Sequence, residues 1–130
     1  MKILVTGIDG MIGHKIAQSL SKKFQVFGST RKKIKSINIG TEKCEIINHD
    51  FIIDNKLGLI DEIDPDIIIN CVGITIRRGL NNSIENTKKL NSDLPHKLNH
   101  WVETNNKKLI HLSSDCVFSG KKGNYSDESI

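Results

Sequence analysis

Three glycines near the N-terminus have the spacing of a phosphate-binding turn. Gly7, Gly10 and Gly13 follow a short apolar run at 3–5, and apolar residues recur after them at helical spacing. A strand that turns into a helix at such glycines presents backbone N–H groups and the positive end of the helix dipole to a pyrophosphate. The pattern therefore predicts a dinucleotide-binding turn, and a glycine-rich turn without a ligand is the alternative.

A second candidate position lies where residues 25–30 end. This stretch reads QVFGST, which is typical of a strand. It ends about 20 residues after the glycines, where an acid would bind the ribose hydroxyls of NAD. Ser29, Thr30 and Arg31 stand there instead. Because a guanidinium pairs bidentately with phosphate, Arg31, with Lys32 as helper, favours NADP(H) over NAD(H); a solvated basic turn is the alternative.

Polar or small residues also follow the later predicted strands. Ligands of open α/β sheets bind at the carboxyl ends of the strands, so these positions are candidates for the same site. Asp50 is placed to accept a hydrogen bond from an adenine amino group, although it could equally cap the helical pattern that follows it. The other positions are Gly73, Ser113, Ser114 and Asp115.

Strand and helix patterns alternate along the chain. This alternation predicts an α/β fold, a Rossmann-type doubly wound parallel sheet of order 3-2-1-4-5, with residues 1–130 as one domain. Pro95 interrupts the helical pattern at 84–102, so we expect either a kink there or a new helix that starts near Ser92. The predicted strands are 3–5, 25–30, 44–48, 66–72 and 108–112.

Composition excludes several classes of protein. At 37 % hydrophobic and 26 % charged residues, the chain is typical of a globular domain, and no apolar run reaches the length of a membrane span. The net charge of +4 is concentrated near residues 31–35 without interleaved aromatic residues, which argues against nucleic-acid binding.

Three scattered cysteines without a secretion signal indicate reduced thiols and a cytoplasmic protein. His96 and His100 have metal-ligand spacing, but without an evident third ligand we interpret them as a polar helix face.

Four stretches carry a resemblance to a known family. They are VTGIDGMIG at 5–13, DIIINCVGI at 66–74, LNSDLPHKL at 90–98 and LIHLSSDCVFSGKKGNYSDES at 109–129. The chain resembles the extended short-chain dehydrogenase/reductase superfamily, and within it the dTDP-4-dehydrorhamnose reductase-like enzymes that modify nucleotide sugars. The last stretch is the most specific, because it is similar to the pattern S-T-D-Y-V-F-x-G-x-x-G-x-Y-x-E. The resemblance covers nearly the whole chain but only the N-terminal part of such an enzyme.

The resemblance implies a role for each matching residue. Asp50 and Phe51 would lie by the adenine, and Asn91 matches a structural asparagine of the family's central helix. Ser114, supported by Ser113 and Asp115, would be the catalytic hydroxyl that hydrogen-bonds the keto oxygen of a nucleotide-sugar substrate; hydroxyls that cap a strand-end turn are the alternative. The pyrophosphate would be held at Gly7, Asp9, Gly10, Met11, Ile12 and Gly13, and the ribose and nicotinamide would lie along Cys71, Val72 and Gly73.

The sequence departs from the family in one large respect. The family's Tyr-x-x-x-Lys pair, which protonates the ketone oxygen, has no match, because the single tyrosine is Tyr125 and Ser129 stands four residues on. We therefore expect a truncated, incomplete domain: an N-terminal fragment of a 4-keto nucleotide-sugar reductase that binds the dinucleotide and has little or no activity. A fragment of an NAD-dependent epimerase or dehydratase and a non-catalytic dinucleotide-binding module are the alternatives. Arg31 and the SSDCVFSG stretch argue against the epimerase.

The last predicted strand, KLIHL at 108–112, would lie at the edge of the sheet. An unpaired apolar edge promotes association with another chain. We therefore expect a homodimer, an aggregation-prone monomer or a need for a second chain.

Overall fold

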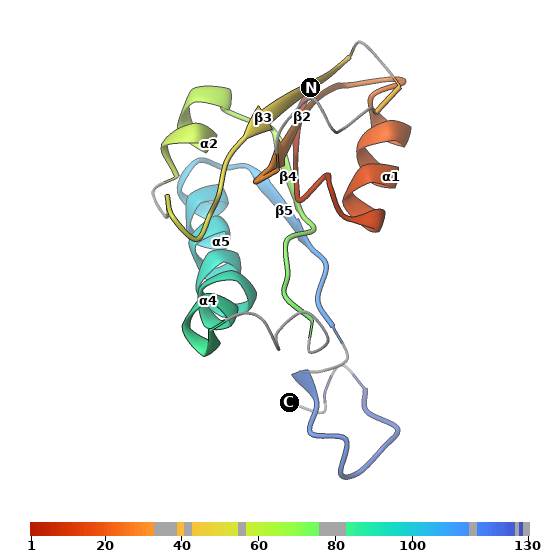
Figure 1. The fold of residues 1–130 in the computed structure, drawn as a ribbon, viewed down its shortest axis with the longest axis vertical. Coiled ribbons are helices and arrows are strands. Elements are labelled where there is room, and N and C mark those ends of the chain that lie inside the picture. The colour runs from red at the N-terminus through yellow and green to blue at the C-terminus, as the bar shows by residue number, and fades with distance from the viewer. Residues whose placement is uncertain are drawn as a thin grey trace.

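Five parallel strands form the centre of the fold (Figure 1). The computed structural model describes residues 1–32, 39–40, 43–54, 57–75, 83–114, 117–126 and 128. The strand order β3-β2-β1-β4-β5 and the parallel pairing of every neighbour confirm the predicted doubly wound α/β sheet. The strands are β1 (Lys2–Thr6), β2 (Gln25–Thr30), β3 (Cys44–Asn48), β4 (Ile67–Asn70) and β5 (Lys108–His111).

Helices cover both faces of the sheet. Helix α1 (Met11–Leu20) lies on one face, and α2 (Gly58–Ile63) and α5 (Leu94–Thr104) lie on the other (Figure 1). Helix α4 (Ile84–Lys88) lies next to α5 at the lower end of the view and contributes no buried residue. Because successive strand side chains point to opposite faces, each central strand contributes to two cores. Leu4 belongs to the core with α2 and α5, whereas Ile3 and Val5 belong to the core with α1.

Two predicted elements end earlier in the structure than in the sequence pattern. The strand predicted at 66–72 spans only Ile67–Asn70. Just before it, the Asp66 carboxylate accepts a hydrogen bond from Lys2 N at 2.8 Å. The strand predicted at 108–112 ends at His111, although Leu112 N still donates to Asn70 O at 3.1 Å. Helix α2 ends where Asp64 takes a left-handed φ of 47°.

The long helix contains a π-helical turn that the periodicity did not predict. Helix α4 runs through the π turn η2 (Lys89–Asp93) directly into α5, so the helical region extends from Ile84 to Thr104. Pro95 has no N–H, and its ring would clash with a carbonyl four residues earlier in a regular helix. The wider π turn before Pro95 relieves both problems. Helix α5 therefore starts at Leu94 with Pro95 in its first turn, without a break in the chain's helical course.

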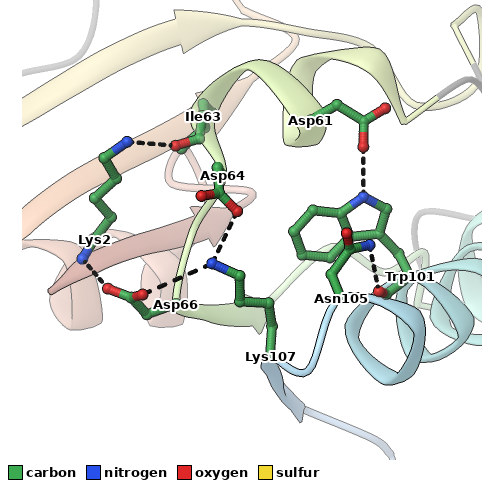
Figure 2. A network of polar contacts seen from close by, with 8 residues as sticks. All are labelled: Lys2, Asp61, Ile63, Asp64, Asp66, Trp101, Asn105 and Lys107. Atoms are coloured by element: carbon green, nitrogen blue, oxygen red, sulfur yellow. Dashed lines mark hydrogen bonds and ion pairs between the residues drawn. The ribbon is translucent and has the colours of Figure 1, made fainter.

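Charged side chains tie the strands together at the amino end of the sheet (Figure 2). Lys107 Nζ, which is largely buried, lies 2.8 Å from Asp64 and 3.8 Å from Asp66. Lys2 Nζ donates to Ile63 O at 2.9 Å. The segments that lead into β1, β4 and β5 are thus joined by one network.

A hydrogen bond fastens α5 to α2 beside this network. Trp101 Nε1 donates to Asp61 Oδ1 at 2.6 Å, and Asn105 Nδ2 donates to Trp101 O at 2.8 Å (Figure 2). Trp101 is 8 % exposed and belongs to the core under both helices. The indole ring therefore packs as a core side chain while its N–H is satisfied at the surface.

The strand β5 lies at one edge of the sheet, as predicted. Ile110 and Leu112 are 50 % and 39 % exposed. An edge of this kind can pair with a further strand. Association through β5, as a homodimer or with another chain, stays a prediction.

We predict that Lys107→Met lowers stability at neutral pH more than in acid. The hydrogen bond from Lys107 lowers the pKa of Asp64. The pair therefore stabilises the fold above the carboxyl's unfolded pKa of about 4, and this contribution is lost as pH falls through the lowered folded value. Urea unfolding of wild type and variant across this range should show midpoints that converge in acid. Lys108→Met, which removes an exposed neighbouring lysine, is the matched control, and a difference that did not change with pH would contradict the assignment.

Candidate functional site

The carboxyl ends of β1 to β4 surround a cavity. Its wall includes the segment after each of these strands and Leu90 from the π turn. Ten of the residues predicted for the site line it. They are Gly7, Asp9, Gly10, Thr30 and Arg31, together with Asp50, Phe51, Cys71, Val72 and Gly73.

The glycine turn depends on one left-handed backbone conformation and one close backbone approach. Gly7 has a φ of +69°, a conformation that L side chains rarely adopt. A Cβ atom on Gly13 would lie 2.4 Å from Gly7 O, so only glycine lets α1 pack this closely against the turn. The turn is also fixed to β2, because Gly7 N and Ile8 N donate to Ser29 O at 2.9 and 3.1 Å.

The N-terminus of α1 is open to an anion. Its N-cap Gly10 has no capping side chain, and no acidic residue lies in its first turn. The N–H groups of the first turn and the positive end of the helix dipole are therefore available to a phosphate. Met11 and Ile12 begin this helix and are 87 % and 54 % exposed.

An ion pair joins the glycine turn to the end of β2. Lys32 Nζ lies 3.2 Å from Asp9 Oδ2, and Lys32 N donates to Thr30 Oγ1 at 3.0 Å. Lys32 thus neutralises a carboxylate that borders the cavity. Arg31 is exposed and lines the same cavity. Lys33 and Lys35, the rest of the basic run, lie outside the described residues.

Asp50 closes a turn after β3. Its Oδ1 accepts a hydrogen bond from Ile52 N at 2.8 Å, and Asp50 O accepts from Ile53 N and Asp54 N. The alternative in which Asp50 caps the following helix is therefore wrong, because α2 starts at Gly58 and has Leu57 at its N-cap. Phe51, next in the chain, is 8 % exposed.

The segment after β4 is held by Asn91 from the π turn. Ile74 N donates to Asn91 Oδ1 and Asn91 Nδ2 donates to Ile74 O, both at 2.8 Å. This double hydrogen bond fixes the course of 71–74 along the cavity. Cys71 lines the cavity, and burial raises the pKa of its thiol to about 11, which disfavours the reactive thiolate form.

A buried asparagine that the sequence reasoning missed joins three strand ends. Asn70 is 0 % exposed, and its Oδ1 accepts from Thr6 Oγ1 at 2.6 Å and from Val72 N at 3.2 Å. Its Nδ2 lies 3.1 Å from His111 Nδ1. Asn70 thus connects β1, β4 and β5. The available signal was a single polar residue at the end of the apolar run DIIIN.

Ser113 and Ser114 follow β5 and are exposed. Within the described part of the chain, the cavity wall stops at the segment after β4 and does not include them. Ser114 O accepts a hydrogen bond from Val117 N at 3.3 Å. Asp115 lies outside the described residues, and the catalytic role of Ser114 stays a prediction.

Tyr125 lies in a local turn of the C-terminal segment, which extends away from the sheet (Figure 1). Its ring stacks on Phe118 with the centroids 4.7 Å apart, and its hydroxyl lies 3.1 Å from Ser119 Oγ. The hydrogen bond from Lys122 N lowers the pKa of Tyr125. These contacts give Tyr125 a place in the turn rather than in the cavity wall.

The remaining candidates form no site in the described residues. His96 and His100 are exposed on α5, and the residues described gather no group of three metal-ligating side chains. Within the same residues, no helix is both long enough and apolar enough to cross a membrane.

The sheet order, the glycine turn and the open N-terminus of α1 define the class: a Rossmann-type dinucleotide-binding fold. Comparison with known proteins gives the family. The chain belongs to the family described as the RmlD substrate binding domain, which matches residues 1–130.

Relatives and solved structures agree with this assignment. The chain is 26% identical over 129 residues to the probable low-salt glycan biosynthesis reductase Agl14 of Haloferax volcanii, covering 98% of this chain and 42% of that protein. It is 24% identical over 130 residues to the dTDP-4-dehydrorhamnose reductase of Aggregatibacter actinomycetemcomitans, covering 99% of this chain and 40% of that protein. It thus spans less than half the length of these relatives.

Two solved structures share the fold over the whole chain. A hypothetical dTDP-4-dehydrorhamnose reductase from Sulfolobus tokodaii has a TM-score of 0.80 at 26% identity, and this chain covers 45% of it. The UDP-glucuronic acid 4-epimerase of Bacillus cereus, in complex with NAD, has a TM-score of 0.76 at 26% identity, again with 45% of its chain covered.

We predict that Gly13→Ala distorts the turn and costs about 1–3 kcal/mol of stability, because its Cβ would overlap Gly7 O. Urea unfolding followed by circular dichroism would measure the change. Gly58→Ala is the matched control, since a Cβ there meets nothing within 4 Å. Equal midpoints for the two variants would show that α1 is not packed against the turn as described.

Proposed function

We propose that this chain is the dinucleotide-binding part of an NADP-dependent reductase that acts on a 4-keto nucleotide sugar. The observation that carries the proposal is the cavity that joins the glycine turn to Arg31 at the end of β2. Membership of the RmlD substrate binding domain family and the reductase names of its relatives support the substrate class. The reduced thiols Cys44 and Cys71 fit a cytoplasmic protein.

The residues of the cavity fit such a dinucleotide. The backbone of Gly7 and Gly10 and the N-terminus of α1 would hold the pyrophosphate. Arg31 would pair with the 2′-phosphate. The ion pair of Lys32 with Asp9 removes a repulsive charge from beside the phosphates.

The other half of the dinucleotide would lie along Cys71, Val72 and Gly73, which Asn91 holds in place through Ile74. The bound dinucleotide supplies a hydride. Ser114 would hydrogen-bond the keto oxygen and stabilise the charge that develops there, with Ser113 beside it. The 130 residues contain no Tyr-x-x-x-Lys pair, so we assign no proton donor among them.

A second candidate function is that of an NAD-dependent nucleotide-sugar epimerase or dehydratase. The similarity to the Bacillus cereus epimerase, solved with NAD, favours it. The two functions differ at the end of β2, because the reductase proposal assigns Arg31 to a phosphate that NAD lacks.

We predict that the chain binds NADPH more tightly than NADH and that Arg31→Ala removes most of the difference. Loss of a charge-assisted contact to the 2′-phosphate should weaken NADPH binding about tenfold or more and leave NADH binding unchanged. Isothermal titration calorimetry with both dinucleotides measures this.

Lys22→Ala, which removes an exposed lysine of the turn after α1, is the control for net charge. Tighter binding of NADH by the wild-type chain would favour the epimerase or dehydratase. Absence of binding by either dinucleotide would contradict the proposed function.

A further inference from the structure

Two buried polar atoms in the cavity wall have no hydrogen-bond partner within the described residues. They are Ser29 Oγ and His49 Nε2. Ser29 is 1 % exposed, and the side chain of His49 is 8 % exposed. Buried polar groups in folded proteins are almost always paired, because an unpaired one loses its hydration without compensation. Both residues line the cavity, so a ligand there is in a position to supply the missing partners.

The two residues lie on neighbouring strand ends and on the same face of the sheet. Thr30 O, next to Ser29, accepts a hydrogen bond from His49 N at 2.8 Å. Ser29 stands two residues after Phe27 and His49 two residues after Ile47, and both of these pack in the core with α2 and α5. Because side chains alternate along a strand, Ser29 points to that side. His49 directly follows β3, and its ring contacts Phe51, which belongs to the same core.

Their place in the strand order assigns them to one half of the dinucleotide. The glycine turn follows β1, which lies between β2 and β4. A pyrophosphate on this turn directs one nucleoside over the ends of β2 and β3 and the other along the segment after β4. The end of β2 is the side that meets the adenosine ribose. Ser29 and His49 therefore face the adenosine half.

The surroundings of His49 fix its ring. Phe51 packs edge-on against it, with the ring centroids 4.4 Å apart and the planes at 72°. His49 Nδ1 lies 4.0 Å from Asp54 Oδ2. An imidazole Nε2 can accept or donate a hydrogen bond according to the tautomer, and a serine hydroxyl can do either. Both atoms can therefore pair with the hydroxyl, ring-nitrogen and amino groups of a nucleoside.

We propose that His49 Nε2 and Ser29 Oγ hydrogen-bond the adenosine half of the bound dinucleotide and contribute to its selection. This role rests on the proposed function. It adds two residues that recognise the nucleoside rather than its phosphates. The ligand-free chain then keeps two unpaired polar groups in its cavity wall, which the bound nucleotide satisfies.

The test separates binding from folding. His49→Phe and Ser29→Ala remove the polar atoms and keep an apolar side chain in the wall. Each should weaken binding of NADPH and of 2′,5′-ADP by about five- to tenfold and leave binding of nicotinamide mononucleotide unchanged. The melting temperature of the ligand-free variants should stay equal to that of wild type or rise, because a buried unpaired group has been removed.

Three controls sharpen the experiment. His100→Phe and Ser19→Ala make the same replacements at exposed helix positions and should change neither binding nor melting. His49→Gln returns a polar group to the site and should recover part of the affinity.

Unchanged affinity for 2′,5′-ADP in both cavity variants would overturn the inference while leaving the proposed function intact. A lower melting temperature with equal losses for all three ligands would show a purely structural role and overturn it as well. If His49→Phe does not fold, Ser29→Ala decides. A wild-type chain that binds neither NADPH nor 2′,5′-ADP would contradict the proposed function itself.

Discussion

The approach of Gly13 to the carbonyl of Gly7 is the contact on which the site depends. At the distance that separates them, a Cβ atom on Gly13 would meet both the Gly7 carbonyl and the side chain of Cys71. Because glycine lacks a Cβ atom, the start of α1 can pack against the ends of β1 and β4. The same turn is fixed to β2 through Ser29 O. This one close backbone contact therefore positions the N-terminus of α1 relative to Arg31 and to the segment after β4.

Paired side chains at the amino end of the sheet stabilise the fold, whereas the carboxyl end surrounds the candidate binding site. At the amino end, Lys107 and Trp101 have partners on neighbouring segments, so their polar groups are satisfied within the chain. At the carboxyl end, both side-chain polar atoms of Asn70 have a partner, whereas Ser29 Oγ and His49 Nε2 have none within the described residues. Unpaired buried polar groups are tolerated where a bound ligand can supply their hydrogen-bond partners. This difference is a second argument for the proposed binding site at the carboxyl end, and it does not depend on the glycine spacing.

The sequence predicted most of the framework because short-range patterns determine it. The strands at 25–30 and 44–48 have the predicted bounds, and the order 3-2-1-4-5 follows from the alternation of strand and helix. The pair of hydrogen bonds between Asn91 and Ile74 could not be predicted from periodicity, because it joins a helix to the segment after a distant strand. The π turn could not be predicted either, because a kink, a new helix start or a π turn can each accommodate Pro95. The same holds for His49, whose importance lies in a missing partner rather than in a motif.

Charge at the end of β2 shows why composition alone is a poor guide to a cofactor. The basic run suggested two cations for a 2′-phosphate, but Lys32 is already paired with Asp9 of the glycine turn. An unpaired carboxylate at Asp9 would repel a pyrophosphate, so in the proposed function this ion pair would serve the phosphates on the turn rather than a phosphate on the ribose. In the proposed function, selectivity between the two dinucleotides would then depend on Arg31. Because Arg31 is exposed, its contribution to the proposed binding would depend on how closely the neighbouring wall at Thr30 and His49 held the ribose against it.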